Sequence, residues 1–523
     1  MIRSFLTVSA GTLASRLLGF ARDSMIAALL GAGPVADAFL LSFQLVNVIR
    51  RLLTEGALNA ALVPAWLRVR EAEGAARAAA FAGRVLGTVS AAVIAATTMV
   101  ALLMPLIIAA VAPGFRGHAM LQFAVQDVLL MLPYVAFAGP VAVMMGLMNA
   151  QNRFALTAFS PLLFNIVLIA VMLVLIGWRQ DAARAALIVA ATVGVAGVLQ
   201  LSILLLGRGG GIARPVRIAF DAEMRGFLGK AIPAITATSG PQLLVLGGAF
   251  IASSSPAALT WLYLASRLAE MPLGVVGAAM STVLVPELTR ALRAENHAAV
   301  AHAESRSLEL AVGLALPATL GLIVLSEPLV RLLFEHGVFT ASDAAATAQM
   351  LRWLALALPA HVLVKAMSPA FFARQDSLTP LFAMLKGLAV AIVSALLLGE
   401  IAGPAGVAAG IACGAWSNAL GLIWSAASTF GLSVDLAARR RLPRIVAAGF
   451  AMGGLLWLVQ MALPAPGGDG IGHALTVLVL IVCAVAVYGL LLGLTGVISR
   501  DTLVKALRQA EVSDLHDRGP RGN

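Results

Sequence analysis

Long runs of apolar residues alternate with short polar segments along this chain. A run of about twenty apolar residues is long enough for a helix to cross the hydrocarbon core of a bilayer. The pattern predicts fourteen such spans, at residues 4–28, 34–63, 84–110, 123–148, 157–177, 185–206, 227–251, 258–285, 307–326, 346–372, 380–398, 405–429, 445–464 and 473–498. We therefore expect an all-α polytopic membrane protein with fourteen transmembrane helices.

Lysine and arginine residues divide unequally between the predicted loops. If residue 1 lies in the cytoplasm, the opposite loops hold only Arg116, Arg179, Arg184 and Arg331. The cytoplasmic loops then hold eighteen, namely Arg68, Arg70, Arg77, Arg84, Arg153, Arg208, Arg214, Arg217, Arg225, Lys230, Arg290, Arg293, Arg306, Arg374, Arg439, Arg440, Arg441 and Arg444. Because cytoplasmic loops carry the excess of positive charge, both termini are predicted to be cytoplasmic.

The composition fits this class, with 60% hydrophobic and 12% charged residues, against roughly 45–50% and 25% in soluble domains. The net charge of +11 follows from the loop asymmetry and gives no reason to expect nucleic acid as a partner. The two cysteines, Cys413 and Cys483, have no metal-site spacing. No P-loop, His-Glu-x-x-His or Gly-x-Ser-x-Gly motif occurs. We therefore expect no cofactor, metal or catalytic residue, and an ATP-driven mechanism would need a separate subunit.

Two pairs of short motifs indicate an internal duplication. Val63-Pro64 recurs as Val285-Pro286, and the turn around Ala150 recurs around Ala373, at offsets of 222 and 223 residues. Spans 1–6 and 7–12 would then form two parallel six-helix lobes, and such repeats typically bind substrate between them near the membrane midplane. The predicted regions are an N-terminal lobe at 1–225, a C-terminal lobe at 226–435, two extra helices at 436–499 and a cytoplasmic tail at 500–523.

Ionisable side chains interrupt several spans, although each costs several kcal/mol at bilayer depth and is usually kept where it faces a watery cavity or a partner. Helical spacing places five polar residues on one stripe of span 2, namely Asp37, Gln44, Asn47, Arg51 and Glu55. Guanidinium groups stay ionised and donate planar, paired hydrogen bonds to phosphate oxygens. The set therefore favours an anionic substrate, and comprises Arg16, Arg22, Asp23, Asp37, Arg50, Arg51, Glu55, Arg267 and Glu270.

Purely structural interpretations of these residues stay open. Arg50 and Arg51 lie near the cytoplasmic end of span 2 and could extend to the interface. Three opposite-charge pairs, Arg16 with Asp23, Arg51 with Glu55 and Arg267 with Glu270, could be structural ion pairs. Lys386 in span 11 is a candidate coupling residue, because a buried amine can titrate or replace a bound cation, but it could equally be a lysine that reaches the interface.

The N-terminal motif Ser15-Arg16-Leu17-Leu18-Gly19-Phe20-Ala21-Arg22-Asp23, with Asp37, Asn47, Arg50-Arg51, Glu55 and Ser266-Arg267, resembles the MurJ (MviN) family of lipid II flippases. The likeness extends over nearly the whole chain. It implies the fold of the multidrug/oligosaccharidyl-lipid/polysaccharide exporter superfamily. It also implies alternating access that moves an undecaprenyl-diphosphate-linked peptidoglycan precursor from the cytoplasmic to the periplasmic leaflet of a bacterial inner membrane.

The resemblance assigns roles to residues of this chain. Arg22, Arg50 and Arg267 would engage the diphosphate, with Arg16 in the same substrate-binding set. Supporting polar roles in transport fall to Ser15, Asp23, Asp37, Asn47, Arg51, Glu55 and Glu270. Spans 13 and 14 would form a groove for the polyprenyl tail, and the cell-wall synthesis machinery is a candidate partner. Spans 7 and 11 contain no Asp or Glu, so membrane potential is a better expected driving force than sodium.

Other functions compete with this one. A related flippase could carry a different lipid-linked oligosaccharide, whereas a cationic drug antiporter should have acidic rather than arginine-rich cavity residues. A membrane-embedded polyprenyl-phosphate glycosyltransferase would need catalytic carboxylates in a large external loop, and residues 327–345 supply only Glu327, Glu335 and Asp343. A non-transporting scaffold of the cell-wall machinery is a third alternative.

Overall fold

The computed structural model describes residues 2–54, 57–116, 119–151, 153–206, 213–237, 240–279, 287–288, 290–291, 294, 297–374, 376–431, 435–462 and 470–497. Helices account for nearly all of these residues, and the elements of the described part include no strand, so the all-α prediction is confirmed. The chain forms two compact units, of which the first contains Met1–Leu264, Leu333–Thr347 and Gly399–Val407. The boundary falls inside helix α9, and the lobe limits drawn from the repeat stay a prediction.

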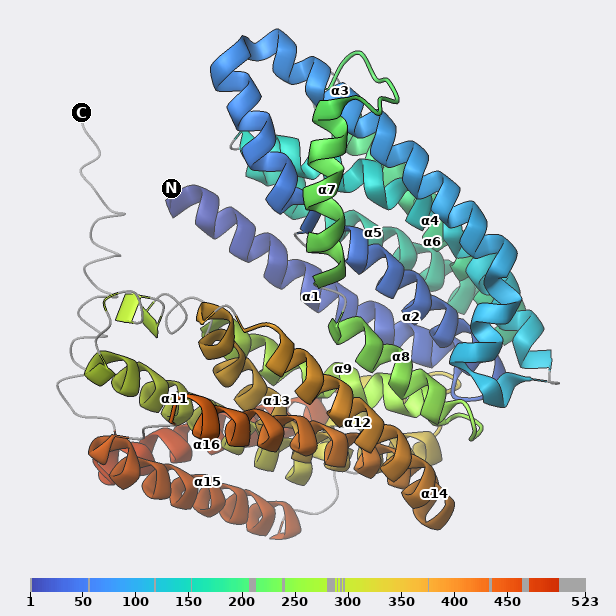
Figure 1. Ribbon diagram of the computed structural model, residues 1–523. Coiled ribbons are helices and arrows are strands. Elements are labelled where there is room, and N and C mark those ends of the chain that lie inside the picture. Colours follow the sequence, from blue (N-terminus) through green and yellow to red (C-terminus); the bar gives the residue numbers. More distant parts are fainter. Residues whose placement is uncertain are drawn as a thin grey trace, which may run out of the picture. The chain divides into compact units, whose positions relative to one another are not determined.

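The first unit is built mainly from the helices coloured blue to green in Figure 1. Its elements are α1 (Ile2–Leu30), α2 (Pro34–Thr54), α3 (Ala57–Val111), the 3-10 turn η1 (Pro113–Phe115), α4 (Ala119–Ala150), α5 (Phe154–Gly177), α6 (Ala182–Leu204), α7 (Ala222–Ala237), α8 (Gly240–Ala252) and the start of α9 (Ala258–Ala279). Helix α4 packs against α2, α3 and α6, while α1 packs on α5. Predicted spans 1–6 therefore lie within one packed bundle.

The second unit contains the remainder of α9 and the whole of α11 (His297–Val324), α15 (Leu436–Ala462) and α16 (Ile471–Leu494). It also contains most of α12 (Ser326–Phe334), α13 (Ala341–Ala373) and α14 (Leu378–Thr429). Helix α15 packs on α11 through Gly449 and Gly453, where an added Cβ would lie 2.8 Å and 3.0 Å from side-chain atoms of Leu316 and Leu320. The Tyr488 hydroxyl of α16 donates a 2.8 Å hydrogen bond to the Gly313 carbonyl of α11. Predicted spans 13 and 14 are thus attached to span 9.

The helices follow the predicted spans with two kinds of difference. Nine of the described helices are long and apolar enough to cross a membrane. Helix α14 runs through predicted spans 11 and 12, whereas α3 contains the end of span 2 and the whole of span 3. In α14 the two parts join at Gly403, whose φ of 58° is a left-handed conformation available to glycine, followed by Pro404. Span 7 is divided into α7 and α8, and α12 forms within a segment expected to be a loop.

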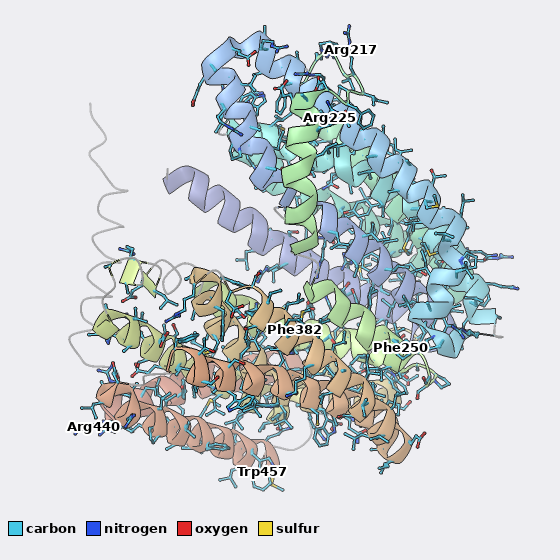
Figure 2. The ribbon with its side chains drawn as sticks, in the orientation of Figure 1. Arg217, Arg225, Phe250, Phe382, Arg440 and Trp457 are labelled. Carbon is cyan, nitrogen blue, oxygen red and sulfur yellow. The ribbon has the colours of Figure 1, made fainter. Side chains whose placement is uncertain are left out.

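The connection between α6 and α7 contains an extended strap, residues 213–221, held against α3. The Thr88 hydroxyl donates to the Ala219 carbonyl (3.1 Å) and accepts from its amide (3.0 Å), and the Arg217 amide donates to the Gly83 carbonyl (3.3 Å). A Cβ on Gly83 would lie 2.2 Å from the Pro215 carbonyl oxygen, so only glycine permits this approach. Arg217 on the strap and Arg225 on α7 are labelled in Figure 2.

Asp221 ends the strap and begins α7. Its carboxylate accepts a 2.9 Å hydrogen bond from the Met224 amide and forms an ion pair with Arg84 of α3. The amide and then the guanidinium lower the pKa of Asp221, because both stabilise the ionised carboxylate. A second ion pair joins Arg84 to Glu223. Helix α7 therefore starts at a position fixed by α3.

Candidate functional site

Arg22 of α1 is buried at the centre of the first unit, with 7% of its surface exposed. Its Nε and Nη2 atoms donate to Oδ1 of Asp23, at 3.0 Å and 2.6 Å, and Nη1 donates to Oδ1 of Asn165 on α5 at 3.0 Å. Asn165 in turn donates to the Ser15 carbonyl, at 3.2 Å. The packing of α1 on α5 thus fixes the orientation of the guanidinium.

Aromatic rings surround the same guanidinium. Its Cζ atom lies 4.8 Å from the ring centroid of Phe43 on α2 and 5.9 Å from that of Phe164 on α5. The Tyr134 ring of α4 lies 4.8 Å from the Phe164 ring. A cation over an aromatic face is attracted by the ring quadrupole, more strongly when water is excluded. Arg22 is therefore a largely desolvated cation, and its hydrogen bonds to the described residues use three of its five N–H groups.

Arg50 of α2 is half-buried near this cluster. Its Nε donates a 3.4 Å hydrogen bond to Asn47, whose amide group donates to the Phe43 carbonyl at 2.8 Å. Both Arg22 and Arg50 are close enough to Tyr134 to interact with it electrostatically. The structure thus brings two of the predicted substrate-binding arginines together around one aromatic cluster.

The other predicted residues of α1 and α2 have different surroundings. Ser15 is half-buried, whereas Arg16 is exposed and takes part in no ion pair of the described chain. Asp23 forms its ion pair with its neighbour Arg22. Arg51 is half-buried, and Glu55 lies outside the described residues, as does the predicted pair between them.

Asp37 ties the beginning of α2 to the beginning of α9. It is 1% exposed, and its Oδ1 accepts hydrogen bonds from the Thr260 amide (2.8 Å) and the Thr260 hydroxyl (2.6 Å). A carboxylate at a helix N-terminus satisfies amide groups that have no partner within the helix and complements the helix dipole. Asp37 and Thr260 are 223 residues apart, which equals the offset of the repeat.

Further contacts join the same ends of these helices. The Tyr263 hydroxyl of α9 donates to Oδ1 of Asp23 at 3.2 Å. The Val338 amide, in the segment before α13, donates to the Ala28 carbonyl of α1 at 3.0 Å, and the Trp261 indole donates to Asp343 at 3.2 Å. The starts of α2, α9 and α13 and the last turns of α1 are therefore linked by polar contacts.

The second unit contains Arg267, Glu270 and Lys386. Arg267 Nη1 lies 3.1 Å from Glu270 Oε2, with the two side chains 25% and 49% exposed. Because both residues belong to α9, their ion pair cannot hold two helices together. Lys386 is an exposed residue of α14. The described residues contain no group of three or more His, Cys, Asp or Glu residues placed to bind a metal ion.

Sequence reasoning missed several members of the site. Asn165 was one polar residue within an otherwise apolar span, and Phe43, Tyr134 and Phe164 resembled ordinary core residues. Nothing in the sequence indicated a role for Thr260, because its partner Asp37 is 223 residues away along the chain. The isolated asparagine in span 5 was the one available indication.

Comparisons with known proteins agree with this architecture. A family model described as "Lipid II flippase MurJ" matches residues 26–478. A relative from Rhizobium meliloti, named "Probable lipid II flippase MurJ", is 37% identical over 499 residues, covering 93% of this chain and 92% of the relative. A solved structure described as "Lipid II flippase MurJ, inward closed conformation" has a TM-score of 0.75 at 22% identity, covering 93% of this chain and 98% of that chain.

A second solved structure is an inward-facing multidrug resistance MATE family transporter of the MOP superfamily. Its TM-score is 0.65 at 14% identity, with 84% of this chain and 98% of that chain covered. Both structural likenesses concern the fold and confirm the exporter fold expected from the sequence. The match of the family model over most of the chain, together with the identity to a curated relative, confirms the predicted family: the chain belongs to the MurJ lipid II flippase family.

Proposed function

We propose that this protein moves lipid II from the cytoplasmic to the periplasmic leaflet by alternating access. As a member of a flippase family it is a transporter and not an enzyme. The observation that carries the proposal is Arg22, a buried cation enclosed by aromatic rings with two N–H groups beyond those used by Asp23 and Asn165. A diphosphate offers the charge and the oxygen spacing that such a guanidinium binds.

The remaining site residues divide between binding and positioning. Arg50, held by Asn47, provides a second cation for the diphosphate. Arg16 and Arg267 are proposed to bind the same anionic group during the transport cycle. Asp23 holds Arg22 in place, and the Ser15 carbonyl holds Asn165. Supporting roles for Arg51, Glu55 and Glu270, and a coupling role for Lys386, remain proposals from the family resemblance.

The polyprenyl tail needs an apolar surface within the membrane. Helices α15 and α16 expose large apolar side chains, including Trp457 (51%), Leu458 (56%), Val482 (58%) and Val485 (67%). These two helices are therefore proposed to hold the tail, with membrane lipids covering them otherwise. Enzymes that consume lipid II on the periplasmic side are the proposed protein partners, and membrane potential is the proposed driving force.

The function can be tested in vesicles that contain the purified protein and fluorescent lipid II. We expect an imposed potential to accelerate the transfer of lipid II between leaflets, measured by the fraction accessible to an external quencher. An undecaprenyl-monophosphate lipid with the same tail should be transferred more slowly, because it lacks the second phosphate. Equal rates for both lipids, or transfer of an unrelated lipid-linked oligosaccharide in preference to lipid II, would contradict the proposal.

The proposed orientation places both termini in the cytoplasm of a bacterium with this protein in its inner membrane. We expect cysteines introduced at Ser254, between α8 and α9, to react with an impermeant maleimide added outside intact cells. Cysteines at Ala76 and Ala301 should react only after permeabilisation, because the segments between predicted spans that contain them carry the cytoplasmic excess of arginine. External labelling at Ala76 would reverse the orientation.

A further inference from the structure

Helix α4 contains a single charged residue, Asp127, and the transport site described above does not use it. Asp127 is 2% exposed, and its Oδ1 atom has no hydrogen-bond partner among the described residues. It lies eight residues from the start of α4, about 12 Å along a helix that rises 1.5 Å per residue. This carboxyl group is therefore buried well inside a membrane-spanning helix.

Charged groups also occur on the elements that pack against α4. Helix α2 carries Asp37, Arg50 and Arg51, Arg184 lies near the start of α6, and Arg116 follows η1. The charged residues of α3 all precede residue 85. Helix α5 carries no charged residue. None of these groups forms an ion pair with Asp127 in the described part of the chain. Among the described residues, therefore, no cation forms an ion pair that would compensate an ionised Asp127.

An unpaired carboxylate is very costly away from water, and such a group takes up a proton instead. A neutral carboxylic acid needs no counter-ion and is far less costly to bury. We propose that Asp127 is a proton-binding site, occupied by a proton in this conformation and able to lose it only when α4 becomes accessible to water.

The position of Asp127 connects it to the arginine cluster. Asp127, Met131 and Tyr134 are spaced at i, i+4 and i+7, so they share one face of α4, and all three are buried. Tyr134 contacts Phe164, over which Arg22 lies. Asp127 is thus about 10 Å along the helix axis from the level of the aromatic cluster.

Loss of the proton would place a negative charge near the cations that are proposed to bind diphosphate. At about 10 Å within a protein, one unit charge changes the affinity of a site for a second charge by roughly tenfold, and two negative charges repel each other. The bound proton therefore favours anion binding, and its release weakens it. This effect on transport rests on the proposed function, whereas proton binding by Asp127 does not.

Infrared spectroscopy of the full-length protein in lipid vesicles tests proton binding directly. At neutral pH, the wild-type spectrum minus that of Asp127→Asn should contain the C=O band of a carboxylic acid, shifted in D₂O. The control Asp221→Asn should remove carboxylate bands only, because the pKa of Asp221 is lowered by its hydrogen bond from Met224 and by Arg84. If Asp127→Asn does not fold, Asp127→Glu, which keeps an acid with a different band position, provides the difference spectrum.

Carboxylate bands alone in the Asp127 difference spectrum would overturn the proposal. So would conversion of the acid to a carboxylate by sodium at fixed pH, which would mean a cation site. In the flipping assay, the wild-type rate should fall roughly tenfold as the pH rises through the range in which the acid band disappears, while the rate of Asp127→Asn should stay the same. An acid band with an unchanged pH profile would reject the link to transport alone, and absence of lipid II flipping by the wild type would reject the proposed function alone.

Discussion

An Arg22→Ala variant is expected to lose all ability to support growth when the chromosomal flippase is depleted. The substitution removes the buried cation that the aromatic rings of Phe43 and Phe164 surround. It also removes the ion pair between Arg22 and the fully buried Asp23, at a cost of about 3–5 kcal/mol. Growth and the amount of protein in the membrane are measured together, because this loss of stability could by itself explain a failure to grow.

Arg22→Lys separates binding from stability. Lysine keeps a positive charge beside Asp23, so we expect the variant to accumulate in the membrane. Its ammonium group lacks the planar pair of donors, so lipid II flipping in vesicles should fall roughly tenfold or more, from the loss of about 1.5–3 kcal/mol in charged hydrogen bonds. Arg217→Ala, on the exposed strap seen in Figure 2, is the matched control and should flip lipid II normally. Normal flipping by Arg22→Lys would mean that Arg22 contributes only charge.

The sequence predicted the transmembrane plan because run length and loop charge are local properties. A run of twenty apolar residues predicts a span wherever it packs, and this is why α4, α5 and α6 coincide with predicted spans 4–6. The joined helices α3 and α14 were not predicted as such, because glycine at 74 and 403 indicates a break but not the direction of the chain beyond it. The short α12 was too short to give a hydropathy signal.

The candidate site was predictable only as a set of ionisable residues that are costly to bury in a membrane. Helical spacing grouped residues of α2 on one stripe, and the cost of burying charge marked Arg22 and Asp37. Their partners could not be predicted, since Asn165 is 143 residues from Arg22 and Thr260 is 223 residues from Asp37. Such contacts depend on how helices pack, which the spacing within one helix does not contain. The unpartnered Asp127 likewise became apparent only from its burial.

The contact between Asp37 and Thr260 is expected to be needed for transport, and the contributions of the two residues can be measured separately. Asp37→Ala removes the acceptor of two hydrogen bonds and leaves the Thr260 amide at the start of α9 unsatisfied, which should cost about 1–3 kcal/mol. Thr260→Val removes only the hydroxyl donor and preserves the shape of the side chain, so its cost should be about 1 kcal/mol. In detergent, the thermal midpoint should fall more for Asp37→Ala than for Thr260→Val.

The double variant decides whether the two residues act through each other. If they do, Thr260→Val should add little to the loss caused by Asp37→Ala, because the hydroxyl has already lost its acceptor. Additive losses of stability would mean that Asp37 acts through residues other than Thr260. We expect flipping to follow the same order, with Asp37→Ala inactive and Thr260→Val reduced severalfold. Thr192→Val is the control, because the Thr192 hydroxyl bonds only to the Ile188 carbonyl of its own helix, and it should leave both stability and flipping unchanged.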